Sequence, residues 1–213
     1  HPELLDWLTR RFIASGWSIK ELHRLILLSS TYRMASVHSH AISYSSIDPE
    51  NKLLWKFPVR RLDAEQSRDA VLATCGRLDL KLDGKSVPLR NRQFVFDHTS
   101  IDHTKYESLR RATYLPIIRN NLYTWLEQFD YPDPTMPTGS RNQTTVAPQS
   151  LLLMNNPLVL ESANVLADRI ASQFSDNTIR LEQLFRELLG RPPSESESAS
   201  CLRYLQSAGQ GAD

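Results

Sequence analysis

Apolar side chains recur at helical spacing along most of the chain. Leu5, Leu8 and Phe12 follow one another at intervals of three and four residues. This spacing predicts an amphipathic helix over residues 3–15. Gly16 stands where a left-handed residue commonly ends a helix, so we expect the helix to stop there.

A second helix is predicted over residues 19–34, because Ser18 and Glu21 form a capping-box pattern at its start. Its apolar positions cover more than one narrow stripe, so we expect this helix to be largely buried. The short connection predicts an antiparallel hairpin of the two helices. Residues 35–49 are rich in Ser and His and show no period, which predicts a loop.

Capping residues and apolar periodicity predict the remaining helices. They span about residues 63–78, 121–129, 149–174, 178–189 and 194–207, and the third of them is expected to kink at Pro157.

The middle of the chain has a different pattern. Residues 93–96 and 111–118 are rich in β-branched and aromatic side chains, which predicts a small two-stranded ribbon. We therefore expect a mostly α fold, an irregular multi-helix domain with one small two-stranded β element. A single helical domain would cover residues 1–208, with a frayed tail at 209–213.

Composition and charge narrow the function classes. The 25 Lys and Arg residues nearly balance 24 Asp and Glu residues, and the formal net charge is +1. No global field favours nucleic acid, so we expect no nucleic-acid partner. No apolar run approaches the roughly 20 residues that cross a bilayer, and no signal peptide is visible. The chain begins His1-Pro2 without an initiator Met, which we interpret as a fragment of a longer protein.

The common catalytic and cofactor motifs are missing from the sequence. It has no phosphate-binding glycine loop, no HExxH, no paired CxxC, no GxSxG and no heme-attachment CxxCH. We expect no cofactor in this segment, and whether the protein is an enzyme stays open. Cys75 and Cys201 are either buried free thiols or one long-range disulfide. His38 and His40 stand in a polar stretch typical of a solvated loop, so no metal site is expected.

One charged cluster is a candidate ligand site. Arg61, Glu65 and Asp69 follow at spacings of four, which places them on one helical face with Arg68 beside them. An arginine between two carboxylates can bind a substrate carboxylate or sugar hydroxyls. Alternatively, the cluster is a salt-bridged surface or a polar clasp between helices, and exposed pairs at helical spacing contribute only about 0.2–0.5 kcal/mol each.

A second candidate is the loop over residues 130–148, which contains four prolines and no period. Loops of this length are uncommon in compact domains and often functional. Asp130 and Asp133 could ligate a hard cation or act as a general acid and base. The other polar candidates in this loop are Arg141, Asn142, Thr144 and Thr145. Turn and capping roles explain the same residues without a function.

Four ordered stretches carry a family resemblance. They are residues 1–8 (HPELLDWL), 16–33 (GWSIKELHRLILLSSTYR), 60–69 (RRLDAEQSRD) and 141–155 (RNQTTVAPQSLLLMN), and the sequence LGRPP at 189–193 adds a fifth. In this order they resemble the planctomycete-type domain of unknown function, family 1553.

The resemblance implies context rather than chemistry. Members of that family lie C-terminal to a second uncharacterised domain, and often to a cytochrome-c-like module. They look like parts of large extracytoplasmic proteins of polysaccharide-degrading bacteria, with no settled catalytic residues. The residues that fall inside the shared motifs become candidates for a site. They are Arg61, Glu65, Arg68, Asp69, Arg141, Thr145 and Gln149.

Two hypotheses of function follow. The first is a non-catalytic scaffold or interaction module, whose partners are neighbouring domains of the same polypeptide. The second is a carbohydrate-binding or carbohydrate-active domain, with its site between the 61–69 helix and the 130–145 loop. A ligand site predicts an open cleft lined by carboxylates and Arg141, whereas a scaffold predicts arginines held in structural pairs. A third role, recognition of a redox partner beside a cytochrome, rests on the resemblance alone.

Overall fold

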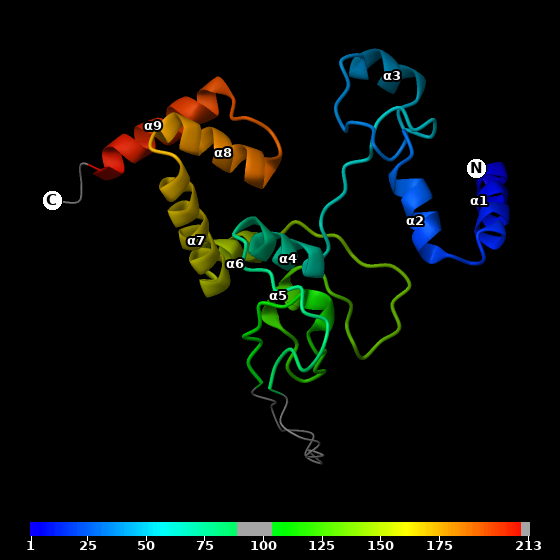
Figure 1. The fold of residues 1–213 in the computed structure, drawn as a ribbon, viewed down its shortest axis with the longest axis horizontal. Helices are drawn as coiled ribbons and strands as arrows, with labels where there is room; N and C mark the ends of the chain where they lie inside the picture. Colours follow the sequence, from blue (N-terminus) through cyan, green and yellow to red (C-terminus); the bar gives the residue numbers. More distant parts are fainter. Residues whose placement is uncertain (89–103, 210–213) are drawn as a thin grey trace. The chain divides into compact units, whose positions relative to one another are not determined.

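The computed structural model describes residues 1–88 and 104–209 (Figure 1). Within these residues the chain forms nine α-helices and one 3-10 helix, which confirms the mostly α fold. The chain divides into two compact units, His1–Arg61 and Leu62–Asp213. The single domain over residues 1–208 stays a prediction.

The first unit begins with a helical hairpin. Helix α1 (Pro2–Ala14) is followed by α2 (Ile19–Leu27) after a tight turn. Gly16 and Trp17 both have positive φ angles, of 69° and 62°, and the Trp17 N–H donates to the Phe12 carbonyl at 3.0 Å. Gly16 therefore ends the first helix as predicted, since a left-handed residue costs glycine little. The Ser18 hydroxyl accepts from the Glu21 N–H at 3.3 Å, which is the Ser18 half of the predicted capping box.

The first unit has almost no buried residues. Neither α1 nor α2 contains a buried residue, and over residues 1–61, all of which are described, Asp48 alone is buried. The prediction that the second helix is largely buried is therefore wrong. That helix also ends at Leu27, seven residues before the predicted end at Met34.

A third helix, α3 (Ala41–Ile47), occupies part of the segment predicted as a loop. The loop prediction was wrong because the sequence of this helix has no apolar period. The helix has no buried apolar face either, since Ile42 and Ile47 are 90% and 76% exposed. Asp48 ends the helix, and its carboxylate accepts from the N–H groups of Lys52 and Leu53 at 2.9 and 2.7 Å. Local polar contacts therefore hold this turn.

The second unit contains the remaining elements. In chain order they are α4 (Ala64–Thr74), the 3-10 helix η1 (Ala112–Tyr114), α5 (Thr124–Gln128), α6 (Ala147–Asn155), α7 (Pro157–Gln173), α8 (Asn177–Leu189) and α9 (Glu195–Gly209).

The predicted kinked helix over residues 149–174 is two helices, α6 and α7. Asn156 between them has an extended backbone, and its side chain accepts from the Leu158 N–H at 2.9 Å. Pro157 occupies the first position of α7, where its missing N–H costs nothing. Proline here starts a new helix rather than bending an old one.

The hydrophobic core of the second unit forms where α4 meets α5 and α7. Trp125 and Leu126 of α5 and Leu72 of α4 are fully buried. The Trp125 indole N–H donates to the Ala64 carbonyl at 3.1 Å, which satisfies its one polar atom. Cys75 lies in a second cluster with Leu166 and Ile170 of α7.

Both cysteines are free thiols, so the disulfide alternative is excluded. Cys201, on α9, is only partly buried, which departs from the expected buried position.

The predicted β element is not confirmed. Residues 111–118 contain η1 instead of a strand, and residues 93–96 lie outside the described part of the chain. The described residues contain one isolated bridge, between Asp79 and Arg110. None of the described helices combines the length and the apolar character needed to span a bilayer.

Candidate functional site

Arg141 and Glu65 join the 130–145 loop to helix α4. The Arg141 guanidinium donates to both Glu65 carboxylate oxygens, at 2.7 and 2.9 Å. A second carboxylate, that of Asp63, lies 4.0 Å from the guanidinium, and the Tyr131 ring centre lies 5.2 Å from it. Two parallel hydrogen bonds fix the orientation of an arginine more firmly than one contact does.

The electrostatics of this pair favour two charged partners. Burial raises the pKa of the Glu65 carboxyl, but the hydrogen bonds and charge of Arg141 outweigh that effect and leave the pKa below its ordinary value. The hydrogen bonds from Arg141 to Glu65 also raise the pKa of the guanidinium. A carboxylate held ionised in this way is a poor general acid near neutral pH.

The start and end of the same loop are tied together through Asp130. This residue has a left-handed backbone, with φ of 60°. Its carboxylate accepts from the Thr144 N–H at 2.7 Å and from the Thr144 hydroxyl at 2.8 Å. Gln149, which is 3% exposed, donates to the Gln128 carbonyl at 2.9 Å and accepts from the Val146 N–H at 3.3 Å. These contacts close the loop at its base.

Arg68 and Asp69 tie another segment to α4. Arg68 is completely buried and donates to the carbonyl oxygens of Ser108 and Arg110, the latter at 2.9 Å. Asp69 accepts from the Ala112 N–H at 2.8 Å and lies 3.4 Å from the Arg68 guanidinium. Arg68 therefore does not belong to an exposed salt-bridged surface, since it is buried and donates chiefly to backbone carbonyls of another segment, as a polar clasp does.

Asp133 takes part in a local turn. Asp133 accepts from the hydroxyl and the N–H of Thr135, at 2.6 and 2.8 Å, and these contacts lower its pKa. Asn142 and Thr145 are exposed. Arg61 precedes the first residue of α4 by three positions, so it does not share a helical face with Glu65 as predicted.

The candidate residues therefore form three structural clasps. Glu65 holds Arg141, Asp130 holds Thr144, and Asp69 holds the backbone of Ala112. Across the described ranges, no group of three or more His, Cys, Asp or Glu side chains is placed to hold a metal ion. His38 and His40 contact each other and Tyr44, with the His38 ring accepting from the His40 N–H at 3.1 Å.

A hollow of about 680 Å³ lies elsewhere in the second unit. Tyr106 and Tyr123 stack in its wall with ring centres 5.0 Å apart, and the Tyr106 hydroxyl donates to the Asn121 carbonyl at 2.7 Å. Arg77 and Glu161 form an ion pair of 3.1 Å at its edge. None of the predicted site residues lines this hollow.

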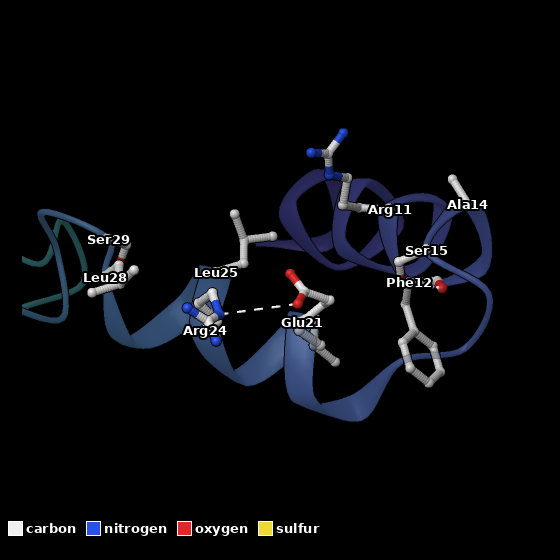
Figure 2. Close-up of a pocket in the computed structure, with 10 residues that line it drawn as sticks. Arg11, Phe12, Ala14, Ser15, Glu21, Arg24, Leu25, Leu28 and Ser29 are labelled. Carbon is white, nitrogen blue, oxygen red and sulfur yellow. Dashed lines mark hydrogen bonds and ion pairs between the residues drawn. The ribbon is translucent and has the colours of Figure 1, made fainter.

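A groove of about 620 Å³ lies between α1 and α2 in the first unit (Figure 2). Its apolar lining consists of Phe12 and Ala14 from α1, Leu22 and Leu25 from α2, and Leu28 directly after α2. The polar lining consists of Arg11, Ser15, Glu21, Arg24 and Ser29.

The apolar period of α2 is the sequence signal for this groove. The periodic leucines of α2 indicated a helix buried within the domain, whereas the structure leaves them as the wall of an open groove. Periodicity identifies an apolar face and carries no information about what covers it.

Comparison with known proteins identifies the family. Residues 1–205 match the model of a family described as PSD1, protein of unknown function (DUF1553). The match covers nearly the whole chain, so the chain belongs to this family. No curated protein and no solved structure is significantly similar to it.

Proposed function

We propose that this member of the DUF1553 family is a non-catalytic scaffold or interaction module of a larger protein. It would bind a neighbouring polypeptide surface through the hairpin of α1 and α2. The observation that carries this proposal is the absence of any buried apolar side chain over residues 1–61, all of which are described.

That absence has an energetic consequence. Ordering one residue costs about 1–2 kcal/mol, and the burial of one large apolar side chain returns about 1.5–3 kcal/mol. Leu5, Trp17 and Ile19 are 66%, 66% and 62% exposed, so these three large apolar side chains contribute little to the stability of the hairpin. A covering surface would supply the missing stabilisation, and exposed apolar surface of this extent is typical of an interaction site.

The state of the carboxylates supports a role without catalysis. A general acid needs a pKa near the working pH, whereas the pKa values of Glu65 and Asp133 are lowered by their partners. Asp130 is held by two bonds from Thr144. Glu65 and Asp133 are therefore held in the ionised form, which does not suit a general acid near neutral pH.

The wider setting is also a proposal. The sequence resemblance suggests an extracytoplasmic protein in which this chain accompanies a second uncharacterised domain and a cytochrome-c-like module. In that setting the partners would be the neighbouring domains of the same polypeptide.

Hydrogen exchange tests the proposal. The amides of α1 and α2 would exchange rapidly in the isolated chain and become protected by about tenfold or more within the longer protein. Equal exchange in both would overturn the proposal. Strong protection already present in the isolated monomer would do the same, since the hairpin would then be covered without a partner.

A second candidate function is carbohydrate binding beside Arg141. It is supported by the position of the Arg141 guanidinium, which is 36% exposed, faces the Tyr131 ring and neighbours two carboxylates. Such a group can donate to sugar hydroxyls while an aromatic ring contacts the sugar face. A saturable rise in melting temperature with one glycan, abolished by Arg141→Ala, would support this function. No shift with any glycan would remove it.

A further inference from the structure

The groove between α1 and α2 has a shape suited to a helix. Its two walls are helices, and the α2 wall is nine residues long, or about 13 Å at the usual rise per residue. That length accommodates the apolar residues of roughly two helical turns, the arrangement by which amphipathic helices occupy grooves. Phe12, Leu22 and Leu25 provide the apolar contacts.

The charges at the rim of the groove are not balanced. Glu21 and Arg24 approach only to 4.0 Å, and both side chains are about three-fifths exposed, so their attraction is weak (Figure 2). Arg11 makes no side-chain bond to any of the described residues, although it lines the same groove. The lining of the groove therefore contains two guanidinium groups and one carboxylate.

We infer that this groove binds an amphipathic helix of another polypeptide whose flanks carry carboxylates. The inference rests on the proposed interaction role and adds the chemistry of the partner. Carboxylates beside the apolar stripe of the incoming helix would reach Arg11 and Arg24 and form charge-assisted hydrogen bonds. A helix with basic flanks would meet like charge at both arginines.

A second copy of the same groove is a poorer occupant. It would bring its own Arg11 and Arg24 against the first pair, with Glu21 as the only carboxylate from each lining. Juxtaposed like charges oppose such an association, so the isolated chain is expected to be monomeric.

Two synthetic peptides test the inference. Both are helices of about four turns with the same leucine stripe, and their flanks are all Glu in one and all Lys in the other. We expect the Glu peptide to bind the chain about tenfold more tightly than the Lys peptide, measured by fluorescence anisotropy of labelled peptide. The double variant Arg11→Glu, Arg24→Glu should reverse this preference.

A matched control separates the groove from general charge. Arg10 and Lys20 lie on the same two helices, are exposed and do not line the groove. The variant Arg10→Glu, Lys20→Glu changes the net charge by the same amount and should keep the preference for the Glu peptide.

Other results would overturn the inference. They are equal binding of both peptides, a preference that both double variants change alike, self-association of the chain abolished by Leu25→Asp, or binding to anionic lipid vesicles without binding to either peptide. If α1 and α2 become protected in the longer protein while the peptides bind equally, the inference fails and the interaction role stands. If protection is absent as well, both fail.

Discussion

Arg141 and Glu65 are separated by 76 positions in the sequence and meet through two hydrogen bonds of 2.7 and 2.9 Å. The pair fastens the proline-containing 130–145 loop to the first turn of α4. Helical spacing placed Glu65 in a cluster with Arg61 and Asp69, but its partner in the structure comes from the other candidate site. Glu65 from one sequence candidate and Arg141 from the other therefore form one of the three clasps.

Replacement of Arg141 by alanine should lower the stability of the second unit. Because the guanidinium is partly exposed, we expect the free energy of unfolding to fall by about 1 kcal/mol. Urea unfolding would measure the change. Arg141→Lys keeps the charge but loses the two-pronged geometry, so it should restore only part of the loss. An unchanged midpoint in Arg141→Ala would show that the pair does not stabilise the fold.

The same pair should make stability depend on acid. The pKa of Glu65 is lowered in the folded chain from an ordinary value of 4.5. Its contribution is therefore complete above pH 4.5 and is lost as the pH falls through the folded pKa. The difference in unfolding free energy between the native chain and Glu65→Gln should shrink below pH 4.5. Glu127→Gln, an exposed change on α5, provides the control and should show no such pattern.

Removal of the buried guanidinium at position 68 should be more damaging. In Arg68→Met the carbonyl groups of Ser108 and Arg110 lose their donor, and we expect a loss of about 2–4 kcal/mol. Chemical unfolding would measure it. Arg77→Met, which removes a single bond to a largely exposed Glu161, should cost about 0.5 kcal/mol. Equal effects of the two substitutions would contradict the structural role of Arg68.

Polar substitutions on the open face of the hairpin should separate stability from assembly. Leu5→Gln and Ile19→Gln change side chains that are 66% and 62% exposed, so the stability of the isolated chain should stay within about 0.5 kcal/mol. Protection of α1 and α2 in the longer protein should decrease. A large loss of stability in the isolated chain would show that these side chains are already covered there.

Features that depend on near neighbours were predictable from the sequence. Glu197 and Ser194 cap α9 reciprocally, at 2.8 and 3.3 Å, and Gly190 ends α8 in a left-handed conformation. Each of these contacts lies within a few residues, where the chemistry of the residues decides the geometry. The contacts of Glu197 with Arg191 and Ser194 lower its pKa to about 2.

Features that depend on distant residues were not predictable. Helical spacing predicted that Arg68 and Asp69 lie together. It could not predict their partners, Ser108 and Ala112, which lie 40 or more residues further along the chain. Likewise, the apolar period of α2 was correct, whereas its burial was not. The sequence of a helix shows which of its faces is apolar, but it does not show which segment, if any, packs against that face.

The contacts of Arg141 with Glu65 and of Thr144 with Asp130 fix the 130–145 loop, so the sequence and length of its tip can change without loss of the fold. Asp130 and Thr144, 14 residues apart, already hold the two ends of the loop together. The entropic cost of closing a longer loop rises slowly, by only about 0.6 kcal/mol for a doubling of its length. Gly139 stands at an open place, with no atom within 4 Å of the position that a side chain would begin to fill. A short peptide tag spliced at Gly139 would therefore leave the second unit folded. It would place a label in the second unit and leave the sequence of the hairpin unchanged.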